Sequence, residues 1–455
     1  MFRVVSCVEE MSSSTFPLRA SPRAAVVAGL VLLLAPALEF VATGAALAGT
    51  RVVHVDRRDG GCSDAGNGTA AAPYCSIGAA LADVRAGTRI DVESGVYPEA
   101  VRVRTSGTSS ALIVLQAADG ANVTIDSPGT GITASQVRWV TIRGFNVNDP
   151  VGYGILVSQS SHITVEDNHV SGAGKPVNGG TRGGVIVKGT TNSLIVGNTS
   201  EHNSDSGFAV LGTSTGVRVS GNRSFGNARQ YRPAAPGIDI QASGNTIDRN
   251  LVYGNEDSGI QLYNGAVDNV VVDNVTYNNG DHGIDALYSP DNAIVSNTIA
   301  GNATSGITLE SGSGGATIEN NIVADNGVGL RGDIWVDGTS TRGTSLNFDL
   351  LRQTSAGAAF FTWSGARYTS VFAFRKATGQ EGRGKAGDPK FVDRANGNLQ
   401  LSAGSPAIDS ADMSSTMSTM TDLTDTARLD DPSTANSGVG GCIFADRGAY
   451  EYVPG

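Results

Sequence analysis

The 455-residue sequence is poor in charge, in aromatic residues and in cysteine. Only 16% of its residues are charged, and 43 acidic residues outnumber 32 basic ones to give a net charge of −11. We therefore expect no nucleic-acid partner, because phosphate binding needs a basic surface. An acidic chain can still hold an acidic polymer when a bound cation mediates the contact.

The four cysteines do not form a zinc motif, because none stands in a Cys-x-x-Cys or Cys/His cluster. Cys62 and Cys75 flank a loop rich in glycine and alanine, and in an exported chain we expect them to form a disulfide. Cys7 would leave with an export signal. The sequence leaves the state of Cys442 open.

The apolar run near the N-terminus is short for a membrane-spanning helix. It covers 24–38, about 15 residues, whereas a spanning helix needs roughly 20. Arg19 and Arg23 precede it, and Ala-Leu-Ala at 46–48 resembles a signal cleavage site. We predict that residues 1–48 are a signal peptide and that the mature protein is secreted, extracellular and free of the membrane. The alternative is an uncleaved membrane anchor.

Glycine and asparagine, in contrast, are frequent and recur at a regular spacing. The chain has 60 glycines, and blocks of the form Asn-x4-Asn begin at intervals of 24, 28, 24, 23 and 24 residues. The blocks are 198–203, 222–227, 250–255, 274–279, 297–302 and 321–326. Alternating residues precede the blocks, and a glycine followed by an apolar residue comes after the first five. This pattern is typical of short half-buried strands separated by tight bends.

One such unit cannot bury its apolar face alone, whereas stacked units bury a continuous interior. Asparagines at the same turn of successive coils can hydrogen-bond along the stack. No helical pattern lies between the strands, which argues against a βαβ fold or a leucine-rich horseshoe, and a propeller blade needs about 40 to 50 residues. We predict an all-β chain that forms a monomeric parallel β-helix from about residue 52 to 452.

The N-terminal part of the predicted coil resembles that of bacterial secreted right-handed β-helix proteins. The segment 64–81, which includes Ala-Pro-Tyr-Cys-Ser-Ile-Gly, and Ser-Gly-Val-Tyr at 94–97 are similar to their capping segment. The resemblance implies a right-handed coil. It also implies that 76–84 forms a short capping helix over the open end of the coil.

The C-terminal part resembles the terminal coils of the same proteins. The similar segments are 388–393, 404–409 and 448–452. We therefore expect a β-helix with an N-terminal cap over 49–345, an aromatic-rich insert over 346–387 and C-terminal coils of the β-helix over 388–455.

Aspartates recur at fixed positions around the repeated glycine. Asp257 and Asp281 stand two residues before it, and Asp239 and Asp285 stand two residues after it. Neighbouring coils are about 4.8 Å apart, so these carboxylates should converge. Stacked carboxylates repel each other unless a cation intervenes, and calcium takes 6 to 8 oxygen ligands. The sequence therefore predicts a metal site, whereas the alternative is that these aspartates only satisfy backbone donors at turns.

Asp257 and the segment Asp-His-Gly-Ile-Asp at 281–285 resemble the calcium motif of the family 9 pectate lyases. In that family, one aspartate lies a coil before an Asp-Asp-Gly-aromatic-Asp segment. The resemblance implies that Asp257, Asp281 and Asp285 bind calcium. His282 stands where the family has a second aspartate.

The family also places a lysine base two residues after the glycine of a following coil. Thr308 occupies that position here, and Arg331 occupies it one coil later. We take Arg331 as the candidate catalytic base and His282 as the fallback, because histidine titrates in a more convenient range. Glu310 and Tyr263 either border the same groove or coat the sheet.

Taken together, these residues predict a calcium-dependent polysaccharide lyase that acts by β-elimination on an acidic, uronate-containing polysaccharide. Two alternatives remain open. The chain is either a surface or matrix protein that binds glycans without cleaving them, or a glycoside hydrolase that uses the same aspartates as its carboxylate pair.

Overall fold

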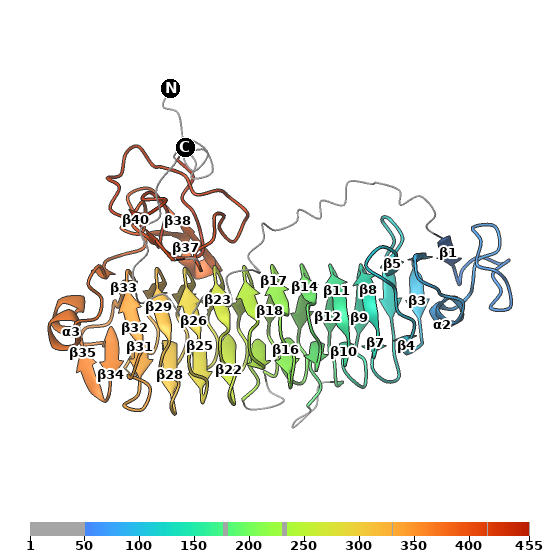
Figure 1. Cartoon of the computed structure of the whole chain (residues 1–455), viewed down its shortest axis with the longest axis horizontal. Coiled ribbons are helices and arrows are strands. Elements are labelled where there is room, and N and C mark those ends of the chain that lie inside the picture. Colours follow the sequence, from blue (N-terminus) through green and yellow to red (C-terminus); the bar gives the residue numbers. More distant parts are fainter. Residues whose placement is uncertain (1–50, 176–180, 230–233, 330, 416, 455) are drawn as a thin grey trace.

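The computed structural model describes residues 51–454, except 176–180, 230–233, 330 and 416. The chain winds into one elongated coil, and successive turns add strands to three sheets (Figure 1). Each sheet has twelve strands, and neighbouring strands pair in parallel except at β34 and β35. The predicted parallel β-helix is confirmed.

Every third strand along most of the chain belongs to the same sheet. Sheet 1 consists of β1 (Arg51–Val55), β2 (Thr88–Val92), β5 (Ile113–Ala117), β8 (Arg138–Arg143), β11 (Ser161–Glu166), β14 (Leu194–Val196), β17 (Arg218–Ser220), β20 (Thr246–Asp248), β23 (Val270–Val272), β26 (Ala293–Val295), β29 (Thr317–Glu319) and β32 (Ser345–Asn347). Sheet 2 consists of β4 (Val101–Val103), β7 (Ile132–Ser135), β10 (Ile155–Ser158), β13 (Val185–Lys188), β16 (Phe208–Leu211), β19 (Ile238–Gln241), β22 (Ile260–Tyr263), β25 (His282–Leu287), β28 (Ser305–Glu310), β31 (Gly332–Val336), β34 (Phe361–Trp363) and β35 (Ala366–Tyr368). Sheet 3 consists of β3 (Gly95–Tyr97), β6 (Val123–Ile125), β9 (Phe145–Asn148), β12 (His169–Ser171), β15 (Thr199–Glu201), β18 (Arg223–Phe225), β21 (Leu251–Tyr253), β24 (Val275–Tyr277), β27 (Thr298–Ala300), β30 (Ile322–Ala324), β33 (Leu350–Arg352) and β36 (Lys385–Ala386).

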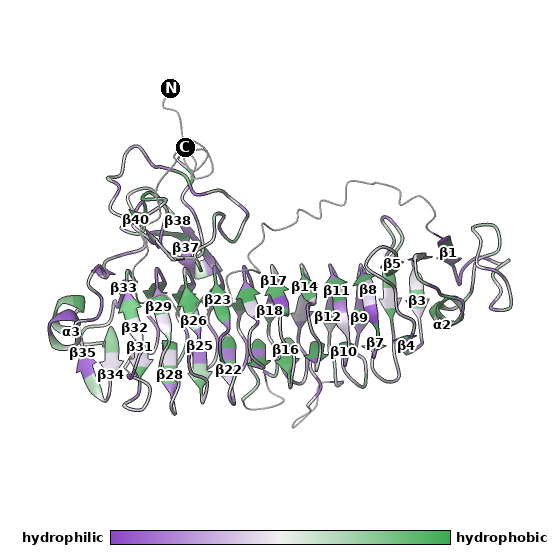
Figure 2. Ribbon diagram, in the orientation of Figure 1, coloured by the Kyte–Doolittle hydropathy of each residue, from purple (hydrophilic) through white to green (hydrophobic). Residues whose placement is uncertain are grey.

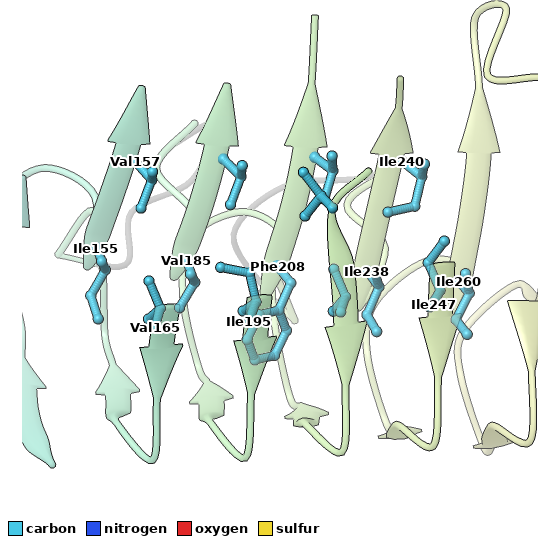
Figure 3. Close-up of a cluster of buried hydrophobic side chains, with 14 of the residues drawn as sticks. Ile155, Val157, Val165, Val185, Ile195, Phe208, Ile238, Ile240, Ile247 and Ile260 are labelled. Carbon is cyan, nitrogen blue, oxygen red and sulfur yellow. The ribbon is translucent and has the colours of Figure 1, made fainter. Parts of the chain in front are cut away.

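The interior is built from side chains that alternate between the two faces of each strand. In sheet 2, paired positions of successive coils carry buried residues that stack in a row (Figure 3): Ile155, Val185, Phe208, Ile238 and Ile260. Burial of one such side chain contributes about 1.5–3 kcal/mol. Figure 2 shows hydrophobic residues along the whole length of the coil, so each turn supplies its own share of the core.

Two long ladders of buried asparagines connect the coils at their turns, beside a shorter one formed by Asn245, Asn269 and Asn292. The first ladder contains Asn168, Asn198, Asn222, Asn250, Asn274, Asn297 and Asn321 and ends on Asp349. The second contains Asn203, Asn227, Asn255, Asn279, Asn302 and Asn326 and ends on Asp333. In the first, each side-chain amide donates to the side-chain oxygen of the next member over 2.9–3.1 Å. The repeated Asn blocks therefore supply a continuous series of buried polar contacts between coils.

Near the N-terminal end, helix α2 (Ile77–Ala82) contacts β1 and β4. The Ser76 hydroxyl accepts a backbone hydrogen bond at the start of the helix. A disulfide joins Cys62 to Cys75 just before it. That α2 closes the open end of the coil stays a prediction, and the predicted signal peptide 1–48 lies outside the described residues.

Residues 346–387, predicted to be an insert, extend the coil instead. Strands β33, β34 and β36 each add to one of the long sheets. Between β35 and β36, helix α3 (Val371–Thr378) places Phe374 against Phe361 with ring centroids 3.9 Å apart. The segment was predicted to be an excursion packed against the coil, whereas its strands continue the coil and Phe361 and Phe374 belong to the core.

Residues 388–455, predicted to be terminal coils, leave the coil within the described part of the segment, so this prediction is wrong. Strands β37 (Phe391–Asp393) and β38 (Asn398–Leu401) pair antiparallel around the 3-10 helix η1 (Arg394–Asn396). Strand β39 (Asp412–Met413) pairs with β40 (Val439–Gly440), and Figure 1 shows this segment beside the coil.

The cause of this arrangement is the outer face of sheet 3. The outward side chains of Val275, Ala300 and Ala324 are apolar there, and Leu399 and Ala449 cover them. A segment that covers an outer face cannot also continue the stack.

Buried charges also fix the C-terminal segment. The Arg428 guanidinium lies 3.2 Å from Asp273 of the coil and 3.0 Å from Glu451. Cys442, in the same segment, is buried and is not a free thiol. In the described part of the chain, no helix is long and apolar enough to cross a membrane.

Candidate functional site

The candidate site lies on the outer face of sheet 2. Because Ile284 and Ala286 of β25 belong to the core, Asp285 between them is directed outward. The strand register places one row of residues across this face: Asp239, Gln261, Asp285, Thr308 and Trp335.

Three potential metal ligands converge beside this row. One ligand atom each of His282, Asp285 and Glu310 can be chosen so that all three lie within 4.8 Å of one another. His282 and Asp285 begin and centre β25, and Glu310 ends the adjacent β28. His282 is 3% exposed and Asp285 is 2% exposed, so neighbouring residues enclose these two side chains, whereas Glu310 is half-buried.

Asp285 is bound on one side only. Its Oδ2 accepts a hydrogen bond from Gln261 Nε2 over 3.0 Å, and its buried Oδ1 has no hydrogen-bond partner. Burial raises the pKa of Asp285 to about 8, with a further increase from the charge of Glu310. The carboxyl is therefore largely protonated at neutral pH unless a cation replaces the proton.

The His282 ring is fixed by two hydroxyl groups. Its Nδ1 lies 2.9 Å from Ser305 Oγ and 3.0 Å from Thr308 Oγ1, and its Nε2 lies 3.5 Å from Asp281 Oδ2. Burial lowers the pKa of His282 to about 4, and the Arg331 charge also lowers it, against the opposing effect of Asp281. The imidazole is therefore neutral at physiological pH.

Asp257 and Asp281 form a second acidic pair at the turn before β22 and β25. Burial raises the pKa of Asp257 to about 7, and the charge of Asp281 adds to this increase. The pKa of Glu310 is raised by burial, whereas Arg331 acts to lower it. A carboxyl group that titrates near neutral pH, as Asp257 does, is suited to proton transfer.

Of the four predicted metal ligands, the structure brings Asp257, Asp281 and Asp285 to one region, since their charges act on one another. Asp239 lies elsewhere. Gln261 stands between Asp239 and Asp285 in the row. The Oδ2 atom of Asp239 accepts a hydrogen bond from Gln241 over 2.8 Å. The spacing from the repeated glycine predicted correctly that Asp239 lies in the same row as Asp285. It did not show that Asp239 is two coils away from Asp285.

Arg331 does not occupy the predicted position of the base, so the positional argument for it is wrong. Gly332 pairs with Ser305, and Trp335 stands opposite Thr308. The reason is that the glycine at 329, from which the position was counted, precedes the strand and is not equivalent to Gly306. Trp335, which occupies the position opposite Thr308, was not predicted because the position was counted from Gly329.

The Arg331 side chain nevertheless reaches the site as a cation. Its guanidinium lies 3.5 Å from the centroid of the Trp335 ring and 3.7 Å from a Glu310 oxygen. Glu310, assigned from sequence only to a groove border or the sheet surface, is thereby linked to both the acidic cluster and the arginine.

A groove of 430 Å³ adjoins the cluster on the outer face of sheet 2. Gln261, Tyr263 and Leu287 line it nearest the cluster, and Ile186 and Asp239 line it farther away. A cavity of this size that mixes apolar side chains with polar ones is suited to a small ligand or a sugar.

The carboxylates fit a divalent cation. Oxygen donors are the ligands that calcium takes, and the buried Asp285 Oδ1 needs a partner. The nitrogen of His282 is a further donor, of a type that calcium does not require.

Known proteins share the coil. A family model described as the right-handed β-helix region matches residues 111–275 and 231–348. The uncharacterized protein YwoF of Bacillus subtilis (strain 168) is 25% identical over 422 residues, which cover 76% of this chain and 90% of that protein. The solved structure of pectate lyase Pel9A has a TM-score of 0.56 at 18% identity, covering 88% of this chain and 96% of that one. The XylC structure with xylose has a TM-score of 0.49 at 12% identity, covering 75% and 87%.

Proposed function

This chain belongs to the right-handed β-helix family, and from that premise we propose that it is a carbohydrate-active protein. Its proposed activity is cleavage of a uronate-containing polysaccharide by β-elimination, outside the cell. The observation that carries the proposal is the convergence of His282, Asp285 and Glu310 within 4.8 Å beside a 430 Å³ groove. The likeness to pectate lyase Pel9A is consistent with this assignment.

The polymer would lie across the strands of sheet 2, in the groove that leads from β13 to β25. Arg331 is suited to bind the uronate carboxylate, because its guanidinium is held over Trp335 next to the cluster. The rest of the groove would contact neighbouring sugars through Tyr263 and Gln261.

β-Elimination breaks the C–H bond next to the uronate carboxylate. Its electrons form a C=C bond while the bond to the leaving glycosidic oxygen breaks, and that oxygen takes a proton from solvent. Asp257 is the candidate base, because its pKa of about 7 is matched to neutral pH, whereas His282 with a pKa of about 4 is too weak a base.

A divalent cation would be held by Asp285, with either Asp281 and Asp257 or His282 and Glu310 as the further ligands, and the sequence motif alone predicts calcium. When bound, it would supply positive charge that neutralises the substrate carboxylate. Asp257 can serve as a ligand or as the base but not as both at once, so its substitution should remove turnover in either role.

The test measures the ultraviolet absorbance of unsaturated products from pectate, alginate and glycosaminoglycans, with calcium or with a chelator. We expect turnover on at least one polymer, its loss in chelator and its loss in Asp285→Asn. Asp119→Asn, at an exposed position of another coil, is the matched control and should retain full activity. Absence of unsaturated product from every polymer would refute β-elimination.

A glycoside hydrolase is the second candidate, favoured by one observation. Asp285, with a pKa of about 8, is a carboxylic acid at neutral pH. One of its oxygens lies within 4.8 Å of an oxygen of Glu310. An acid and a carboxylate at short range are the pair that retaining glycosidases use. This candidate predicts new reducing ends without ultraviolet absorbance, unaffected by chelator, whereas binding without any product supports a glycan-binding protein.

A further inference from the structure

We propose that His282, Asp285 and Glu310 bind a divalent transition metal, such as Zn²⁺ or Mn²⁺, in preference to calcium. This inference rests on the proposed function for the use of the ion in catalysis, but the binding itself is measured without substrate.

The donor set favours such an ion. It offers one imidazole nitrogen and two carboxylate oxygens within 4.8 Å of one another, from adjacent strands of one sheet. Imidazole suits zinc and related ions, and carboxylates suit manganese as well as calcium. Calcium takes 6 to 8 ligands, all of them oxygen, so a nitrogen in the tightest part of the cluster counts against it.

A second observation independently points to a ligand at this place. Asp285 is 2% exposed, and its Oδ1 has no hydrogen-bond partner while Oδ2 is held by Gln261. Buried carboxylate oxygens are nearly always satisfied. One oxygen of Asp285 lies within 4.8 Å of a ligand atom of His282 and of Glu310, so an ion held by the three side chains would give the buried carboxyl its missing partner.

The imidazole is also held at one nitrogen, which leaves Nε2, 3.5 Å from Asp281 Oδ2, as the nitrogen for an ion. Ser305 Oγ and Thr308 Oγ1 both contact Nδ1 of His282 and hold the ring in place. Histidine ligands in metal sites characteristically make such a bond through the nitrogen that does not bind the metal. Both hydroxyls belong to β28, the same strand that supplies Glu310.

The experiment titrates the purified, chelator-treated chain with MnCl₂, ZnCl₂ and CaCl₂, and follows heat by calorimetry and bound Mn²⁺ by electron paramagnetic resonance. We expect Mn²⁺ and Zn²⁺ to bind roughly tenfold or more tightly than Ca²⁺. His282→Asp, which makes the donor set all oxygen, should reverse the preference toward Ca²⁺. Glu310→Gln, at a half-buried position, is a second variant and should weaken all three ions.

The surface offers a matched control. His169 and His202 lie 2.7 and 2.8 Å from the two oxygens of Glu201, on sheet 3 and the turn after it. His202→Ala should leave the titrations unchanged. Equal affinity for calcium and manganese in the wild type, an unchanged preference in His282→Asp, or loss of binding in His202→Ala would each overturn the proposal. Metal binding without any polysaccharide product would refute only the proposed lyase function.

Discussion

Gln261 and Asp285 face each other on neighbouring coils, and the bond between them occupies only one of the two carboxylate oxygens. The two oxygens of Asp285 therefore differ in their hydrogen bonding. The oxygen that Gln261 binds is satisfied, whereas the other is buried and has no hydrogen-bond partner.

Gln261→Ala should therefore raise the pKa of Asp285 further, because the Gln261 hydrogen bond acts to lower it. We expect the pH profile of activity to shift to higher pH and the free energy of unfolding to fall by about 1–3 kcal/mol. Activity against pH and denaturant titration measure the two effects. Gln400→Ala, at an exposed position, should do neither, and an unshifted profile in Gln261→Ala would contradict the assignment.

Stability should fall as pH rises in the absence of divalent ions. The folded pKa of Asp285 is about 8 against an ordinary value of 3.8, so the folded state binds more protons than the unfolded state between these values. The contribution of Asp285 is full below 3.8 and is lost as pH passes about 8. Melting temperatures across this range should decline less steeply in Asp285→Asn, and equal slopes would argue against the buried carboxyl.

Asn250→Ala should interrupt the first asparagine ladder. Asn250 Oδ1 accepts from both the backbone N–H and the side-chain amide of Asn222 over 3.0 and 3.1 Å. Two buried donors would lose their partner, at a cost of about 2–4 kcal/mol in the free energy of unfolding. Denaturant unfolding checks this value against Asn67→Ala, an exposed control that should change it little.

Arg428→Ala should release the C-terminal segment while the coil stays folded. Its guanidinium is 1% exposed and pairs with Asp273 and Glu451, so removal leaves two buried carboxylates and costs about 3–5 kcal/mol. Limited proteolysis should then cut within 388–455 and spare the coil. The exposed Arg102→Ala should be cut as slowly as the wild type, and equal resistance of Arg428→Ala would count against this lock.

The coil could be predicted from sequence because its contacts are local in the repeat. Asn198 and Asn222 differ by one turn, and the same amide bond recurs wherever that spacing recurs. The same repeat spacing also predicted the row of outward residues that contains Asp239, Gln261 and Asp285. Its convergence with Glu310 was less visible, because Glu310 ends a strand where an outward carboxylate is also an ordinary surface residue.

Prediction failed where the repeat changes length. Arg331 was counted from a glycine that the strand register does not use, and the true partner of Thr308 is Trp335. The segment from 388 failed for another reason: its contacts, such as Arg428 with Asp273, join residues far apart in the chain, and no spacing records them.

Both long asparagine ladders end on an aspartate, at Asp349 and Asp333. An asparagine at these places would carry an amide whose hydrogens need an acceptor on a further coil. A carboxylate accepts the last amide and needs no acceptor on a further coil. Both aspartates are fully buried, and β34 and β36 continue the sheets beyond them, so the two ladders stop inside the protein while the last coil is still covered by its own chain.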